Sequence, residues 1–169
     1  STRTSKTFSI IRYAEILLAY AEAVNHLTSS HTITMESGQT YTLSRAATLN
    51  DAVFAFNQVR FRSGQPALSA DEIASEDALD KAVRHERFVE FFCEGRRYHD
   101  VRRWGILEEV ESEPITGMNV EADAANYYVR TIVNHSDYRN RVCDKKMVFI
   151  PLERNEVRKS RLLDQNPGW

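Results

Sequence analysis

Charged and aromatic side chains are concentrated between Arg84 and Gly105, where the chain reads RHERFVEFFCEGRRYHDVRRWG. Glu86, Glu90 and Glu94 are spaced four residues apart, so on a helix their carboxylates share one face. Paired carboxylates are the groups with which glycosidases perform acid–base chemistry. Each of these carboxylates, however, has arginines close by in the sequence. Pairing with arginine keeps a carboxylate ionised, which suits a structural role better than that of a general acid.

We expect this segment to form an amphipathic helical hairpin whose guanidinium groups pair with carboxylates against a hydrophobic body. Acidic and basic residues alternate along it at helical spacing. The pattern predicts a buried or semi-buried ion network of Glu86, Arg87, Glu94, Arg97, Asp100 and Arg103. The interleaved acids argue against nucleic-acid binding, as does the formal net charge of −2 for the whole chain.

Two dipeptides, His85-Glu86 and His99-Asp100, could begin a metal site. A zinc-protease motif requires a second histidine four residues after the first, and Val89 occupies that position. The second dipeptide resembles that of metal-dependent HD phosphohydrolases, but no other histidine lies in a matching pattern. The sequence contains no GxSxG, P-loop or GxGxxG motif. We therefore expect no catalysis, no metal and no cofactor, and keep a metal-dependent hydrolase as an alternative hypothesis.

The two cysteines, Cys93 and Cys143, form no CxxC motif and have no histidine at zinc-ligand spacing. Cys93 follows two phenylalanines, so we expect it to be a buried small hydrophobic residue. A disulfide between the two cysteines is left open for an oxidising compartment.

Several aromatic residues lie in polar stretches outside any apolar period. Proteins commonly bind a sugar with an aromatic face under the C–H side of the ring and with amides or carboxylates on the hydroxyls. The candidate ligand contacts are Asn126, Tyr127 and Tyr128, followed by Tyr41 and Tyr138. The alternative is that these tyrosines only anchor a long loop onto the body of the protein.

Helical periodicity extends through the first two-thirds of the chain. We expect helices over about 8–27 and 46–61, joined by a polar loop at 28–44 in which a small hairpin is possible. A third helix follows the acidic capping stretches at 69–77 and continues to Gly95. A further helix extends toward Val110.

Periodicity is lost from residue 111 to 146, where we expect a long loop layer with a short strand at 128–133. The apolar run in MVFIPLERNEV predicts a strand before Pro151, followed by a brief helix near 155–160. The predicted fold class is mainly α. It consists of tetratricopeptide-like helical hairpins, over about 8–61 and 72–110, with an irregular C-terminal loop layer, in a single domain spanning 1–169.

The composition is that of a soluble globular protein, with 169 residues, 42% hydrophobic and 27% charged. No apolar run approaches the roughly 20 residues needed to span a bilayer. The first residues lack the features of a signal peptide. We expect the sequence to be a fragment of a longer chain.

Five segments of the chain carry a resemblance to a known family: ERFVEFFCEGRRYHDVRRWG, RYAEILLAYAEAVN, FNQVRFRSGQP, FIPLERNEV and LLDQNPGW. They resemble the SusD/RagB family, the surface nutrient-binding lipoproteins of Bacteroidetes. The first segment is similar to a signature of that family, and the second to its helix entering a tetratricopeptide-like region. FNQVRFRSGQP is similar to another of its elements. FIPLERNEV and LLDQNPGW match its characteristic ending.

The resemblance implies a mostly helical scaffold at the surface of the outer membrane, held there by an N-terminal lipid anchor that this sequence does not contain. It also implies a SusC-type TonB-dependent transporter as partner and an oligosaccharide, or in some members a peptide, as ligand. The match corresponds to the C-terminal portion of the family, whose ligand-binding residues lie largely upstream. A helical-repeat adaptor that binds another protein is the alternative from a different class.

Overall fold

The structure is a computed structural model that describes residues 10–118, 120, 128–133 and 141–169. The chain divides into two compact units, residues 1–96 and 97–169.

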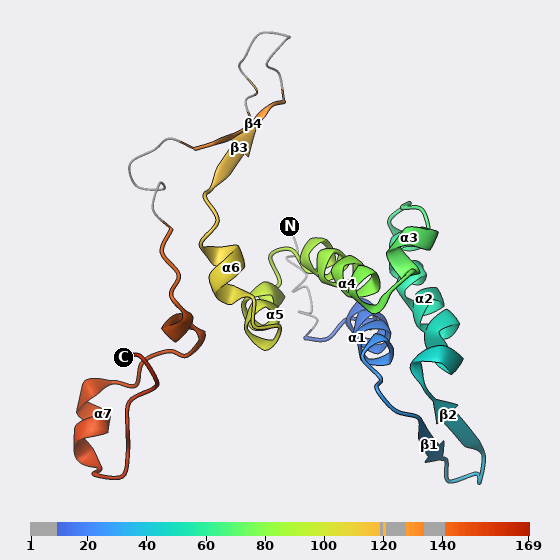
Figure 1. The fold of residues 1–169 in the computed structure, drawn as a ribbon, viewed down its shortest axis with the longest axis horizontal. Coiled ribbons are helices and arrows are strands. Elements are labelled where there is room, and N and C mark those ends of the chain that lie inside the picture. The colour runs from blue at the N-terminus through green and yellow to red at the C-terminus, as the bar shows by residue number, and fades with distance from the viewer. Residues whose placement is uncertain (1–9, 119, 121–127, 134–140) are drawn as a thin grey trace, which may run out of the picture. The chain divides into compact units, whose positions relative to one another are not determined.

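Three helices build the first unit: α1 (Tyr13–Asn25), α2 (Arg45–Arg62) and α4 (Glu76–Glu90). Helix α1 packs against both α2 and α4 (Figure 1). Apolar residues of α1 recur at helical spacing and are buried, as an amphipathic helix in a core requires. The fully buried apolar side chains of this core are Leu18, Ala21, Ala52, Phe56, Leu79 and Val83.

Serine caps set where several of these helices begin. The Ser44 side chain accepts a hydrogen bond of 3.1 Å from the Ala47 amide at the start of α2, and Ser75 does the same for Ala78 in α4. The short helix α3 (Ala70–Ile73) begins with a capping box formed by Ser69 and Glu72. Local sequence therefore fixes these helix starts.

An antiparallel hairpin of β1 (His31–Thr34) and β2 (Thr40–Leu43) occupies the loop between α1 and α2. Ile33 lies opposite Tyr41 in its register. Gly38 has a φ of +80°, a conformation that glycine adopts without strain. The hairpin that the sequence left possible is therefore present.

The second unit begins within α5 (Arg96–Arg103), whose first residue belongs to the first unit. Helix α6 (Leu107–Glu111) follows, and then β3 (Thr116–Met118), which pairs antiparallel with β4 (Arg130–Ile132). The 3-10 helix η1 (Lys145–Val148) contacts α6, and α7 (Arg154–Lys159) precedes the C-terminus. The strand expected at 128–133 and the helix expected near 155–160 are both found, each slightly shorter than predicted or displaced by one residue.

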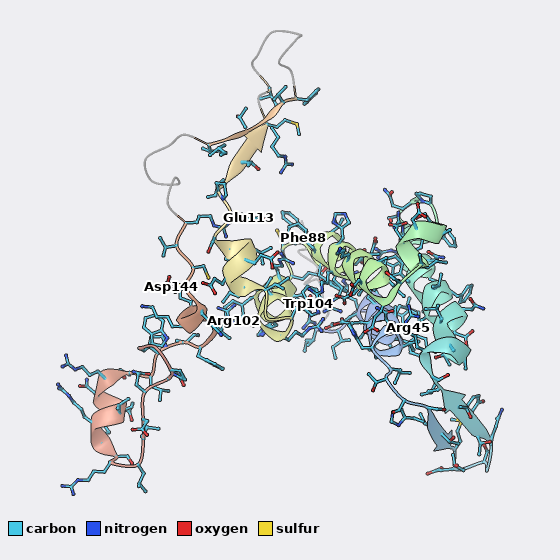
Figure 2. All side chains as sticks on the ribbon, viewed as in Figure 1. Arg45, Phe88, Arg102, Trp104, Glu113 and Asp144 are labelled. Atoms are coloured by element: carbon cyan, nitrogen blue, oxygen red, sulfur yellow. The ribbon has the colours of Figure 1, made fainter. Side chains whose placement is uncertain are left out.

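The strand predicted before Pro151 is wrong, because residues 145–148 form η1 instead. Arg102, labelled in Figure 2, belongs to α5. It donates hydrogen bonds to the carbonyl oxygens of Val148 (3.1 Å) and Met147 (3.3 Å). The indole Nε1 of Trp169 lies 3.0 Å from the carbonyl oxygens of both Lys146 and Phe149. Side chains therefore satisfy the carbonyl groups that a neighbouring strand would otherwise bind.

The C-terminal residues fold back along the segment after η1. The amide side chain of Gln165 pairs with the backbone of Leu152 through both its oxygen (2.7 Å) and its nitrogen (2.8 Å). Asn166 donates a hydrogen bond of 2.6 Å to the Ile150 carbonyl. A Cβ atom built on Gly168 would lie 2.8 Å from Cβ of Lys146, so this close approach requires glycine.

The prediction that Cys93 is buried is also wrong. Helix α4 ends at Glu90 rather than at Gly95, so Cys93 lies in the turn that follows, with a φ of +63° and an exposed side chain. Of the three consecutive residues Phe91, Phe92 and Cys93, the first is buried and the other two are exposed. Both cysteines are free thiols.

Candidate functional site

Arg12 connects the start of α1 to the end of α4 in the first unit. Its guanidinium binds Glu90 Oε1 at 2.8 Å and both carboxylate oxygens of Glu94 at 2.7 and 3.0 Å. It also donates a hydrogen bond of 2.9 Å to the Glu90 carbonyl oxygen. The hydrogen bond to Glu94 raises the pKa of Arg12, while burial opposes that effect. Arg12 is therefore held in its charged form between two carboxylates.

Further ion pairs link α2 to α4 and Arg96 to α1. Arg62 of α2 pairs with the second oxygen of Glu90, whose side chain is only 8% exposed. Arg96 pairs with Glu15 of α1 at 2.8 Å and donates a hydrogen bond of 2.6 Å to the Ile10 carbonyl oxygen. These carboxylates form ion pairs between helices, so their role is structural.

The ring of Phe91 lies close to two arginines. The guanidinium carbons of Arg12 and Arg87 each lie 5.2 Å from the centroid of its ring. Phe91 is buried, and Arg87 is one of the few buried charged residues. Phe91 therefore contacts basic side chains from the start of α1 and from α4.

The six residues of the predicted ion network lie in both units. In the first unit, Glu94 pairs with Arg12, which the sequence did not indicate as a partner. In the second unit, the buried Asp100 accepts a hydrogen bond of 2.9 Å from Arg103 Nε. Among the described residues Glu86 makes no hydrogen bond or ion pair. The network as a whole stays a prediction.

Glu86 of α4 should make stability depend on pH in an unusual direction. Burial raises its pKa above the ordinary value of 4.5, and the positive charge of Arg60 opposes this. A raised carboxyl pKa stabilises the fold only while the group is protonated, so this contribution is lost as the pH rises from 4.5 through the folded pKa. We therefore expect Glu86→Gln to increase resistance to urea at about pH 7 and to change little below about pH 4.

Glu72 provides the control of opposite sign. The backbone hydrogen bond from Ser69 lowers the pKa of Glu72 below 4.5, against a smaller effect of burial. Its stabilisation is present above 4.5 and is lost as the pH falls through the folded pKa. Glu72→Gln should therefore reduce urea resistance at neutral pH and have less effect in acid. Shifts of the same sign for both variants at neutral pH would contradict this assignment.

Tyr41, a predicted ligand contact, lines a hollow of about 530 Å³ in the first unit. The hollow lies between the β1–β2 hairpin and the helices α1 and α2. Tyr20 of α1 and Asp51 of α2 also line it, and the sequence did not single them out. Asp51 lies in a polar stretch of an amphipathic helix, so the sequence alone does not indicate that it belongs to a site. Only the position of the β1–β2 hairpin brings it to the wall of a hollow.

The other predicted ligand contacts give less information. Tyr128 is exposed and has a φ of +61°, in the left-handed region where a non-glycine residue is strained. Asn126, Tyr127 and Tyr138 lie outside the described residues.

The second unit has a hollow of about 500 Å³ formed by α5, α6 and residues 141–147. Its walls include the apolar side chains of Val101 and Leu107 and the ion pair between Arg141 and Glu111. Arg102, also in its wall, stacks 3.6 Å from the centroid of the Tyr98 ring. The guanidinium groups of Arg102 and Arg141 are thus engaged with the protein itself.

In the described part of the chain, no group of three histidine, cysteine or acidic side chains is placed to bind a metal ion. Within the same residues, no helix is both long and apolar enough to cross a bilayer.

The packing of α1 against α2 and α4 defines a tetratricopeptide-like helical fold. The family model described as SusD family matches residues 1–169. The chain therefore belongs to the SusD family, which confirms the resemblance seen in its sequence. Members of this family bind nutrients, and they are in general binding proteins without catalytic activity.

Among solved structures, the chain is similar to a SusD-like protein from Bacteroides fragilis, with a TM-score of 0.67 and 27% sequence identity. The alignment covers 95% of this chain and 25% of that protein, so the chain spans about a quarter of its length. The likeness confirms the mainly α, tetratricopeptide-like fold. A search of curated proteins finds no match to this chain.

Proposed function

We propose that the protein binds oligosaccharide nutrients at the bacterial cell surface, without cleaving them, and delivers them to a SusC-type TonB-dependent transporter. The observation that carries this proposal is the SusD family match over the whole chain. The location that goes with this function is the outer membrane, where a lipid anchor would hold the protein at the surface.

The side chains of the first unit favour binding over catalysis. A general acid requires a carboxyl group that can be protonated near neutral pH and can reach the substrate. Glu90 and Glu94 are instead bound by arginines. Burial raises the pKa of Glu86, and the two carboxylates whose charges act on it, Glu90 and Glu72, are themselves paired with arginines. Reversible capture needs neither group to transfer a proton.

Ligand contacts within this chain are proposed at Asn126, Tyr127, Tyr128, Tyr41 and Tyr138. Their flat apolar faces and amide groups suit the two sides of a sugar ring. Tyr128 carries the strained backbone described above, and strain of this kind is often kept at binding sites.

The test is Tyr128→Ala in the full-length protein, with affinity for a panel of oligosaccharides and peptides measured by calorimetry. Loss of an aromatic platform should weaken binding of the cognate oligosaccharide by about 1–3 kcal/mol and spare the fold. Tyr13→Ala is the matched control, because Tyr13 is an exposed tyrosine of α1 that is not among the proposed contacts.

Three outcomes would contradict the proposal in different ways. Unchanged affinity with a lowered unfolding temperature would show that Tyr128 only anchors its loop. Binding of peptides in place of every oligosaccharide would assign the protein to the peptide-binding members of the family. Cleavage of an oligosaccharide by the purified protein would overturn the non-catalytic assignment.

A further inference from the structure

The hollow beneath the β1–β2 hairpin has the size and walls of a small-molecule site. Its volume of about 530 Å³ falls within the roughly 300–1,000 Å³ typical of ligand pockets. Antiparallel pairing places Ile33 opposite Tyr41, so the two side chains share one face of the hairpin. Residues two positions away, Met35 and Leu43, also line the hollow. One face of the hairpin therefore forms an apolar wall that includes an aromatic ring.

The opposite wall comes from the helices and carries polar groups. Tyr20 of α1 and Asp51 of α2 line it, together with Thr48. Tyr20 and Asp51 thus line the same hollow. Burial raises the pKa of the Tyr20 phenol, and the negative charge of Asp51 raises it further. The Thr48 hydroxyl is already engaged, since it donates a hydrogen bond of 2.7 Å to the Ser44 carbonyl oxygen.

The remaining polar groups of the hollow have no partner within the described residues. Tyr20, Tyr41 and Asp51 make no side-chain hydrogen bond or ion pair there. The carboxylates Glu90 and Glu94 of the same unit, by contrast, are each bound by arginine. A carboxylate and two phenols left without partners at one hollow can hydrogen-bond to a ligand.

Charge restricts the kind of ligand. Asp51 is the single charged residue among the side chains that line the hollow. A uronic acid or a sulfated sugar would place a second negative charge beside it, which like-charge repulsion disfavours. An uncharged hydroxyl-rich ring would instead donate hydrogen bonds to the carboxylate while its C–H face contacts Tyr41.

We propose that the hollow between the β1–β2 hairpin and helices α1 and α2 binds one uncharged pyranose ring of an oligosaccharide, with Tyr41 contacting the ring face and Asp51 accepting hydrogen bonds from its hydroxyls. This inference rests on the proposed function, because it gives the oligosaccharide a subsite within this chain. Tyr20 contributes a phenol hydroxyl as a further hydrogen-bonding group.

The experiment uses the full-length protein and a panel of neutral oligosaccharides, with a matched set in which one residue is a uronic acid. Calorimetry of the best neutral ligand should show roughly tenfold weaker binding for Tyr41→Ala and for Asp51→Asn. Tyr41→Phe retains the ring and should stay within about threefold of the wild type. Asp51→Asn should also narrow the preference for neutral over acidic oligosaccharides, because it removes the repelling charge.

Asp71→Asn on α3 is the control for charge, since it removes the same charge from the first unit outside the hollow. Saturation-transfer NMR provides a second measurement. Protons on one face of a single sugar ring should receive less saturation from the Tyr41→Ala variant than from the wild type. A wild-type protein that binds no oligosaccharide overturns the proposed function and this subsite together. A wild-type protein that binds while Tyr41→Ala and Asp51→Asn leave affinity and preference unchanged overturns the subsite and leaves the proposed function intact.

Discussion

Replacing Phe56 by alanine is expected to lower the free energy of unfolding by about 3–5 kcal/mol. Phe56 lies on α2 and its side chain is fully buried in the core that α1, α2 and α4 share. Truncation removes the transfer free energy of a phenyl ring and leaves a cavity that rigid helices fill only in part. Unfolding in urea, followed by circular dichroism at a helical wavelength, measures the loss.

Phe54→Ala is the matched control on the same helix. Phe54 is 65% exposed, whereas Phe56 is 0% exposed. The same chemical change at Phe54 should therefore cost less than about 0.5 kcal/mol. Equal losses at the two positions would show that α2 presents a different face to the core from the one described.

Local patterns predicted the helices of the first unit well. The periodic apolar residues of α2 predicted 46–61, and the helix extends over Arg45–Arg62. Its start is encoded by Ser44, whose side chain accepts a hydrogen bond from the Ala47 amide. Both signals act within a few residues, so the sequence reports them directly.

The wrong predictions arise where distant residues decide. An apolar run before Pro151 suits a strand, but the carbonyl groups there bind Arg102 and Trp169, which lie at least 20 residues away for each bond. Cys93 follows two phenylalanines, and the end of α4 directs only Phe91 into the core. Neither the hydrogen-bond partner nor the helix end is visible in the local pattern.

The candidate site was predicted in part. The polar surroundings of Tyr41 indicated a ligand contact. Tyr20 and Asp51 gave no such indication, because they belong to helices whose apolar periodicity indicates a structural role. The hairpin brings these three residues to one hollow. In the same way, Arg12 stands at the start of an apolar helix, and only the packing of α1 on α4 places it beside Glu90 and Glu94.

Arg12→Ala is expected to lower the free energy of unfolding by about 2–3 kcal/mol. The change removes hydrogen bonds to two carboxylates and one carbonyl group, and it also removes a contact with the Phe91 ring. The loss should stay below the roughly 3–5 kcal/mol of a fully buried pair, because Glu94 is partly exposed and Arg62 still neutralises Glu90.

Arg62→Ala is the control, since Arg62 binds the same carboxylate but its side chain is 57% exposed. An exposed ion pair contributes less than about 1 kcal/mol, so the two arginine variants should differ clearly. Arg12→Lys should recover only part of the loss, because an ammonium group cannot bind both carboxylates with the planar fork of a guanidinium. If Arg12→Ala costs no more than Arg62→Ala, the ion pairs at the end of α4 do not anchor α1. The charged signature of this segment would then require a role in binding rather than in folding.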